Sequence, residues 1–242
     1  MMRFIRGEIY KTFHRAYIYV ATAIMAMCII GASFVLIRTG LTREKILSFA
    51  GVFVVVIMAV MLIFLPMVSD DCKNHTLKNL YMTHLSRRQY FFSKYIVQII
   101  TAVAIALVLY TLLVIGIMAV PFGEEYSCDQ FVEFVLKLIL AIPIFAVSIL
   151  VIDVVYFFTK NELFTFLIYY YGYMQIMGLM VLSGGAADNP VLMFFILPVA
   201  ASNLSNMPLS ITNGIGVVVC GIIHIALLVR LGAKRCEKLK CN

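Results

Sequence analysis

A serine and a histidine in apolar parts of the chain are of the residue types that cleave peptide bonds. Ser183 precedes Gly184 and Gly185, and His224 lies in a later apolar stretch. Such a pair works when the imidazole takes the serine proton and nearby donors stabilise the oxyanion. The spacing in sequence gives no distance between the two side chains, and a histidine in a membrane helix more often makes an interhelical hydrogen bond. An intramembrane serine protease using Ser183 and His224 is therefore an alternative hypothesis.

The cysteines, which could bind a metal ion, are not clustered in the sequence. The six cysteines are scattered along the chain, and no two of them form a Cys-x-x-Cys pair. Structural metal sites in sequences typically show such closely spaced ligands. We predict neither a metal site nor a cofactor in this chain.

Asp153 is the clearest ionisable residue inside an apolar stretch. Carboxyl groups in membrane helices usually face a bundle interior or a cavity, where they mark a functional route. The alternative is that Asp153 pairs with a polar neighbour and only stabilises packing. Both interpretations stay open at the level of sequence.

The apolar sequence FLIYYYGYMQIMGLM, residues 166–180, is rich in tyrosine and methionine. Tyrosines usually mark the membrane interface, but several lie deeper here, so their hydroxyls need partners in the bundle or in a wet groove. Tyr and Met side chains also suit a route for an amphipathic substrate, because both adapt to different ligands. Packing alone is the alternative. The residues predicted to line a substrate route are Tyr169, Tyr170, Tyr173, Gln175 and Met177, together with Asp153.

These residues lie in a chain whose composition indicates a membrane protein. Of its 242 residues, 63% are hydrophobic and 13% are charged, whereas a soluble domain has about 25% charged residues. A membrane helix needs roughly 20 consecutive apolar residues. We predict an all-α, polytopic integral membrane protein with one transmembrane domain over residues 1–242 and six spans. The predicted spans are residues 16–37, 46–69, 93–120, 131–158, 163–182 and 211–231.

Charge gives the expected orientation, because Lys and Arg near helix ends are retained in the cytoplasm. With both termini cytoplasmic, most of the 19 basic residues fall on the inner side. These are Arg3, Arg6, Lys11, Arg15, Lys73, Lys78, Arg87, Arg88, Lys94, Lys160, Arg230, Lys234, Arg235, Lys238 and Lys240. We therefore predict a plasma-membrane protein with cytoplasmic N- and C-termini, and a net charge of +7 that reflects topology rather than nucleic-acid binding.

Three further segments connect or precede the spans. Residues 3–15 place Phe4, Ile5, Ile9 and Phe13 at helical spacing between basic residues, which predicts an interfacial amphipathic helix. Residues 184–210 hold an apolar run too short to span, which predicts a re-entrant or interfacial segment on the outer side.

The third segment, residues 70–92, is the one substantial cytoplasmic connection. Asp70 and Asp71 suit the N-terminus of a helix, where negative charge is favoured. Apolar residues then follow at intervals of three and four up to Leu85, which predicts a short helix with one apolar face. An amphipathic helix without a soluble domain of its own needs a partner or a lipid surface.

The layout and one local sequence resemble the permease subunit of type-2 (ABC-2) ABC exporters. The sequence TLKNLYMTHLSRRQYFFSKY, residues 76–95, is similar to that family's acidic residue, Gly-Thr-Leu, two leucines, Pro-x-Ser-Arg-like turn and lysine at the start of span three. It departs from the pattern at His75, where the family usually has Gly, and in lacking Pro before Leu85-Ser86-Arg87.

The resemblance implies that Asp70–Ser86 is a coupling helix that docks into a groove of a separate ATPase subunit, present in two copies. ATP and Mg²⁺ would be bound by that partner, because this chain has no Gly-Lys dipeptide and hence no Walker A loop. The resemblance also implies a second permease, either a copy of this chain or a homologue. The implied coupling residues are Asp70, Asp71, His75, Thr76, Leu77, Asn79, Leu80, Arg87 and Arg88.

The small size of the chain resembles bacterial exporters for antimicrobial or amphipathic peptides, including permeases for lantibiotic self-protection. We therefore expect a hydrophobic or amphipathic substrate, in particular a peptide. An accessory or sensor membrane protein without transport is the third hypothesis.

Overall fold

The structure is a computed structural model that describes residues 2–38, 61–73, 86–118, 128–174 and 211–237. Every regular element in these ranges is helical and none is a strand, which confirms the all-α prediction. The elements are α1 (Met2–Phe13), α2 (Ala16–Arg38), η1 (Met61–Phe64), α4 (Leu65–Lys73), α6 (Arg87–Met118), α7 (Cys128–Thr159), α8 (Glu162–Leu167), the π-helical η2 (Ile168–Met174) and α12 (Ile211–Glu237).

Three of the described helices are long and apolar enough to cross a membrane, namely α6, α7 and α12. The apolar helix α2 coincides with the first predicted span. With 32 residues, α6 is about 48 Å long, whereas a bilayer core is roughly 30 Å thick, so part of this helix extends beyond the apolar layer. The predicted number of six spans stays a prediction, because residues 39–60 and 175–210 lie outside the described ranges.

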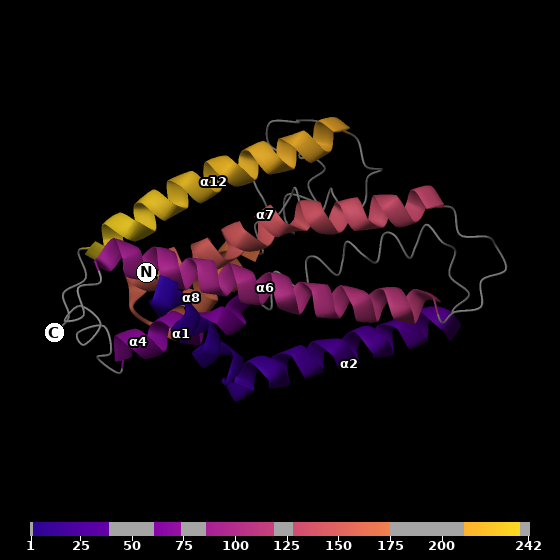
Figure 1. The fold of residues 1–242 in the computed structure, drawn as a ribbon, viewed down its shortest axis with the longest axis horizontal. Coiled ribbons are helices and arrows are strands. Elements are labelled where there is room, and N and C mark those ends of the chain that lie inside the picture. Colours follow the sequence, from indigo (N-terminus) through magenta and orange to yellow (C-terminus); the bar gives the residue numbers. More distant parts are fainter. Residues whose placement is uncertain (1, 39–60, 74–85, 119–127, 175–210, 238–242) are drawn as a thin grey trace.

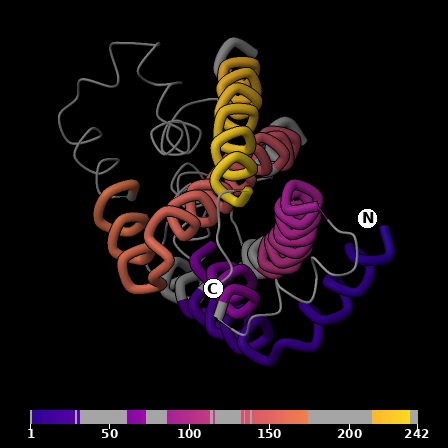
Figure 2. The backbone as a smooth tube through the Cα atoms, turned by 90° about the vertical axis from the view of Figure 1, so that its left-hand side faces the viewer, coloured from indigo at the N-terminus to yellow at the C-terminus, as the bar shows by residue number. Residues whose placement is uncertain are grey.

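The long helices form a bundle in which α2 and α6 run in one direction and α7 and α12 run back (Figure 1). Helix α12 packs mainly on α7 and also contacts α6. The short elements α8 and η2 lie on the side of α7 away from α6 (Figure 2). Buried side chains such as Phe64, Leu109, Phe145 and Leu150 fill the space between the helices.

Two glycines let α12 approach its neighbours closely. A Cβ at Gly221 would lie 2.8 Å from Pro143 Cβ of α7, and a Cβ at Gly232 would overlap the ring of Phe91 of α6. The missing Cβ atoms thus make room for the Pro143 ring and the Phe91 ring against the backbone of α12. Helix α7 continues through Pro143 from Cys128 to Thr159.

A tight turn joins α7 to α8. Lys160 has a φ of 52°, the left-handed conformation that commonly ends a helix, and its N–H donates to the carbonyl of Tyr156 at 2.7 Å. Asn161 then begins α8, because its side-chain oxygen accepts from the N–H of Leu163 at 2.9 Å.

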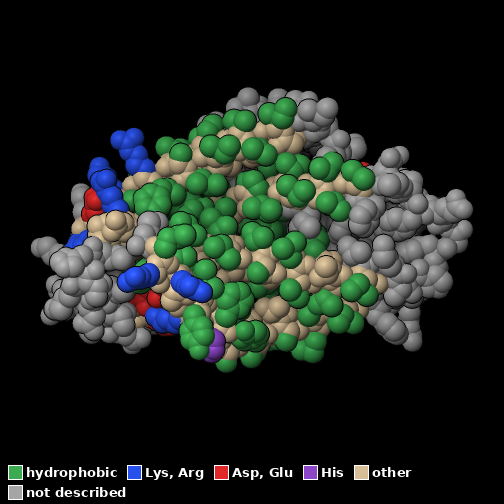
Figure 3. Space-filling view, in the orientation of Figure 1, with side chains coloured by type: hydrophobic (Ala, Val, Ile, Leu, Met, Phe, Trp, Pro, Cys, Tyr) green, Lys and Arg blue, Asp and Glu red, His purple; other side chains and the backbone are tan. Residues whose placement is uncertain are grey.

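Charged side chains gather at one end of the visible face, whereas its middle is hydrophobic (Figure 3). This end holds α1, the end of α4, the beginning of α6 and the end of α12, and we call it the charged end. Among the described residues it contains Lys11, Arg15, Arg88 and Lys94, which belong to the basic residues used to predict the cytoplasmic orientation.

Candidate functional site

Helix α1 confirms the predicted amphipathic segment and adds a buried carboxylate. Phe4, Ile5 and Ile9 pack against the core, whereas Phe13 is exposed, contrary to its predicted place on the apolar face. Between them Glu8 is buried, and its Oε2 forms an ion pair with Lys94 Nζ of α6. The inner face of α1 therefore carries a charge as well as apolar side chains.

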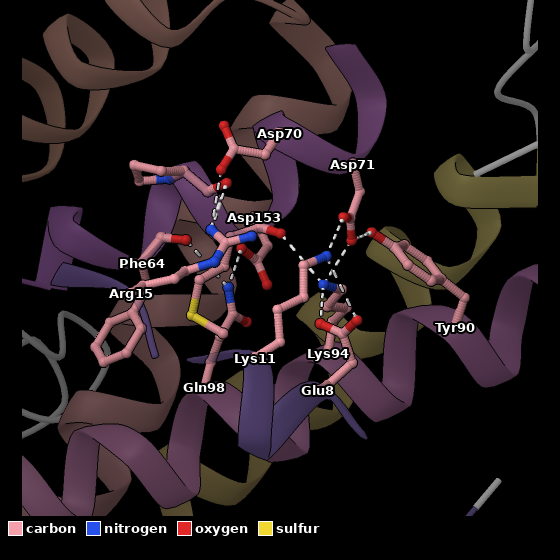
Figure 4. A network of polar contacts seen from close by, with 12 residues as sticks. Glu8, Lys11, Arg15, Phe64, Asp70, Asp71, Tyr90, Lys94, Gln98 and Asp153 are labelled. Carbon is pink, nitrogen blue, oxygen red and sulfur yellow. Dashed lines mark hydrogen bonds and ion pairs between the residues drawn. The ribbon is translucent and has the colours of Figure 1, made fainter. Parts of the chain in front are cut away.

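Lys94 lies at the centre of the charged end (Figure 4). Only 2% of its side chain is exposed, and its ammonium group contacts both Glu8 and Asp71. The same Nζ donates to the carbonyl oxygen of Met67 at 3.4 Å. Three acceptors thus match the three N–H donors of a lysine ammonium group.

Asp71 of α4 accepts from three other side chains. Lys11 Nζ lies 3.2 Å from its Oδ1, the hydroxyl of Tyr90 donates to its Oδ2 at 2.9 Å, and Lys94 pairs with Oδ2. Burial alone raises the pKa of this carboxyl, but the positive charges of Lys94 and Lys11 and the hydrogen bonds outweigh that effect, so the pKa of Asp71 lies below its usual value.

Arg15, between α1 and α2, holds the neighbouring carboxylate. Its Nη1 lies 3.0 Å from Asp70 Oδ2 and also donates to the carbonyl of Pro66 at 3.3 Å. These contacts complete a network in which three bases face three acids, and we call it the ion-pair cluster. Its members are Glu8, Lys11, Arg15, Asp70, Asp71 and Lys94.

The ion-pair cluster joins α1, α4 and α6 through side chains far apart in sequence (Figure 4). Buried ion pairs of this kind add little net stability over apolar packing, but the loss of one partner costs about 3–5 kcal/mol because it leaves an unpaired buried charge. The arrangement therefore fixes the relative positions of these three helix ends more than it stabilises the fold.

The placement of Asp70 and Asp71 corrects one sequence prediction. We expected them at the N-terminus of a coupling helix, but both lie in α4, which begins at Leu65. Their carboxylates therefore form ion pairs with Arg15, Lys11 and Lys94 and do not interact with the N-terminus of a helix. The prediction failed because the helix-terminus rule considers charge along one segment only.

A second contact joins the beginning of α6 to the end of α12. Arg88 pairs with the side chain of Glu237, and Arg87 donates to the Glu237 carbonyl oxygen. Arg235 donates to the carbonyl of Phe157 at 3.4 Å, which also connects α12 to α7. Arg87 and Arg88 were predicted as coupling residues, and the structure places both at the beginning of α6.

Asp153 lies next to the ion-pair cluster but outside it. Its Oδ1 accepts from Gln98 Nε2 at 3.1 Å, and only 1% of the residue is exposed. The structure thus places Asp153 in the bundle interior with a polar partner. A residue that lines an open route would be exposed, whereas Asp153 is buried in the single chain.

The tyrosines over residues 169–173 lie on different sides of the helix and form two stacked aromatic pairs, Tyr169 with Tyr173 and Phe166 with Tyr170. Tyr169 is fully buried and stacks on Tyr173 with ring centroids 5.4 Å apart. Tyr170 is exposed and stacks on Phe166 at 5.7 Å. Tyr170 therefore faces away from the bundle and Tyr169 faces into it.

Several predicted site residues lie outside the described ranges. They are His75, Thr76, Leu77, Asn79 and Leu80 of the coupling segment, Gln175 and Met177 of the substrate route, and Ser183 of the alternative serine–histidine pair. His224 is described, and its Nδ1 lies 2.8 Å from the carbonyl oxygen of Cys220 in the same helix.

Sequence reasoning missed two central residues of the ion-pair cluster, Glu8 and Lys94. Lys94 counted only as a positive charge near the membrane, and Glu8 was not singled out. One signal was present: Glu8 is the single acidic residue of α1, and it lies one helical turn from Ile5 on the face that packs inward.

Comparison with known protein families gives a match over most of the chain. The family model described as ABC-2 family transporter protein matches residues 4–175. The matched range contains the whole ion-pair cluster, α6, α7 and the turn to α8. A comparison with curated proteins finds no significant match. The match covers more than half of the chain, and the protein therefore belongs to the ABC-2 family of transporter membrane proteins.

Proposed function

We propose that this chain is the permease subunit of an ATP-driven exporter that moves a hydrophobic or amphipathic substrate, in particular a peptide, out of a bacterial cell. Transport proceeds by alternating access between inward- and outward-facing states, with both termini in the cytoplasm. A separate ATPase, present in two copies, binds ATP and Mg²⁺ and supplies the energy.

The observation that carries this proposal is the position of residues 74–85 between two anchored helix ends. Helix α4 precedes this segment and α6 follows it, and both are bound to α1 by the ion-pair cluster. A partner that pulls on residues 74–85 therefore moves three helix ends together. A coupling segment has to transmit the movement of the ATPase to the membrane helices. Helix ends that move together can switch from one packing to another as a unit.

The second permease, identical or homologous, fits the same proposal. The side of α8 and η2 that faces away from the bundle exposes apolar and aromatic side chains, namely Leu163, Phe164, Phe166, Tyr170 and Tyr171. We assign Tyr170 of this surface to the substrate route between two permeases, where its ring offers an adaptable contact. Tyr169 and Tyr173 stack on each other behind that surface.

Co-purification and transport measurements test the proposal. The tagged chain extracted in mild detergent should carry an ATPase with a Walker A sequence, in a ratio of one ATPase to one permease. Substitution of both Leu77 and Leu80 by Ala should lower substrate-stimulated ATP hydrolysis at least tenfold without changing the melting temperature. The matched control replaces Leu227 and Leu231, exposed on α12, and should leave hydrolysis unchanged.

Two outcomes would contradict the proposal. A chain that purifies without any nucleotide-binding partner would favour an accessory or sensor protein. Cleavage of a membrane peptide that disappears with Ser183→Ala would favour the intramembrane protease.

A further inference from the structure

Asp153 is a buried acid that the ion-pair cluster does not neutralise. The three bases of the cluster are matched by its own three acids. Asp153 is a fourth acid, and among the described residues no Lys, Arg or His lies within ion-pair distance of it.

The nearest base has no free donor for Asp153. The ammonium group of Lys94 contacts Glu8, Asp71 and the carbonyl oxygen of Met67, which accounts for its three N–H bonds. An ionised Asp153 would thus be a buried charge without its own counterion, which costs several kcal/mol. Groups in this position usually become neutral instead.

The partner of Asp153 shows where a neutralising proton would go. Gln98 Nε2 donates to Asp153 Oδ1 at 3.1 Å and lies 3.5 Å from the carbonyl oxygen of Phe64, so two acceptors identify this atom as the amide nitrogen. The other amide atom, Gln98 Oε1, is buried without a hydrogen-bond donor. An ionised carboxylate has no hydrogen to give it, whereas a carboxylic acid has one.

We propose that Asp153 is a proton-binding site and that Gln98 positions the bound proton. In this packing the protonated carboxyl group donates its O–H to Gln98 Oε1 while its carbonyl oxygen accepts from Nε2. The acid and the amide thus form a ring of two hydrogen bonds between α7 and α6. The proton comes from water, and Asp153 returns it to water when it ionises.

The elements around the site contribute few other ionisable groups. Helix α6 contributes Lys94 and Tyr95, whose hydroxyl donates to the carbonyl of Ala146 at 3.3 Å. Helix α4 contributes Asp70 and Asp71, both paired with bases. The adjoining η1 segment, MLIF, has no ionisable side chain. The remaining neighbours of α7 contribute Glu162 from α8, Tyr169 and Tyr173 from η2 and Arg235 from α12.

Infrared spectroscopy on the purified full chain in lipid nanodiscs tests the proposal, with the spectrum of each variant subtracted from that of the wild type. The measurement requires no transport activity. At neutral pH the wild type should show the C=O stretching band of a protonated carboxyl group, shifted in ²H₂O, and Asp153→Asn should lack it. Gln98→Leu should keep the band but move it to higher frequency, because the carbonyl loses its N–H donor. Glu133→Gln is the matched control, since Glu133 of α7 pairs with Lys137 at 3.0 Å.

Thermal unfolding supplies an independent measurement. Asn at position 153 keeps both hydrogen bonds to Gln98, so Asp153→Asn should melt at the wild-type temperature, whereas Asp153→Leu should melt lower. Absence of the carboxyl band, its loss in Glu133→Gln but not in Asp153→Asn, or equal destabilisation by Asn and Leu would each overturn the proposal. None of these outcomes bears on whether the protein transports a substrate.

Discussion

Lys94 of α6 forms ion pairs with Glu8 of α1 and Asp71 of α4, residues 86 and 23 positions away from it in the sequence. No two of the three belong to the same helix. One ammonium group therefore determines how the N-terminal helix sits against the two helices that flank residues 74–85.

Replacement of Lys94 by Met should destabilise the protein by about 3–5 kcal/mol, because Glu8 and Asp71 would stay buried without their shared cation. Urea unfolding in detergent, followed by circular dichroism, measures the loss. The double variant Lys94→Met with Glu8→Gln should recover part of it, since one unpaired charge is then removed. No recovery would mean that Lys94 acts through packing alone.

The exposed pair of Arg88 and Glu237 should behave differently. Its side chains are 66% and 40% exposed, and exposed ion pairs contribute about 0–1 kcal/mol. Arg88→Ala should therefore change the free energy of unfolding by less than about 1 kcal/mol. A loss as large as that for Lys94→Met would show that α12 depends on this contact for its position.

Acid should weaken the charged end at Asp71. The pKa of this carboxyl is lowered in the folded protein, so its contribution to stability is complete above its unfolded pKa of about 4 and is lost as the pH falls through the lower, folded value. Melting temperatures measured from about pH 6 downward should fall in the wild type. In Asp71→Asn they should start lower and fall less steeply.

The contact between Gly221 and Pro143 should not tolerate a methyl group. A Cβ at position 221 would lie 2.8 Å from Pro143 Cβ, and the proline ring cannot rotate away, so Gly221→Ala should cost about 1–3 kcal/mol. Gly214 of the same helix is the matched control. Its added Cβ would meet Leu140 at 3.5 Å, an ordinary contact, and the higher helix propensity of Ala should make Gly214→Ala neutral or stabilising.

The elements of this fold could be predicted from sequence where a local rule governs them. The interfacial helix over residues 3–15 follows from spacing and charge, and the structure has α1 at Met2–Phe13. The third predicted span begins at residue 93, whereas α6 begins at Arg87, because the helix also includes polar residues that precede the apolar run.

The candidate site could be predicted only in part, because its contacts join distant segments. Asp153 stands out as an acid in an apolar helix, but its partner Gln98 belongs to another helix. Local rules placed Asp70 and Asp71 at the beginning of a helix, whereas bases from other segments determine their role. The sequence likewise does not distinguish Tyr169 from Tyr170, because only the packing of the helix determines that Tyr169 is buried and Tyr170 exposed.

The equal numbers of bases and acids in the ion-pair cluster have an electrical consequence. A transmembrane voltage does work of about 2.3 kcal/mol per elementary charge for each 100 mV crossed. A group with three positive and three negative charges that moves as a unit has no net charge for that field to act on. Protonation of Asp153 extends this neutrality to its neighbour, so the ion-pair cluster and Asp153 together carry no net charge on which the voltage could do work.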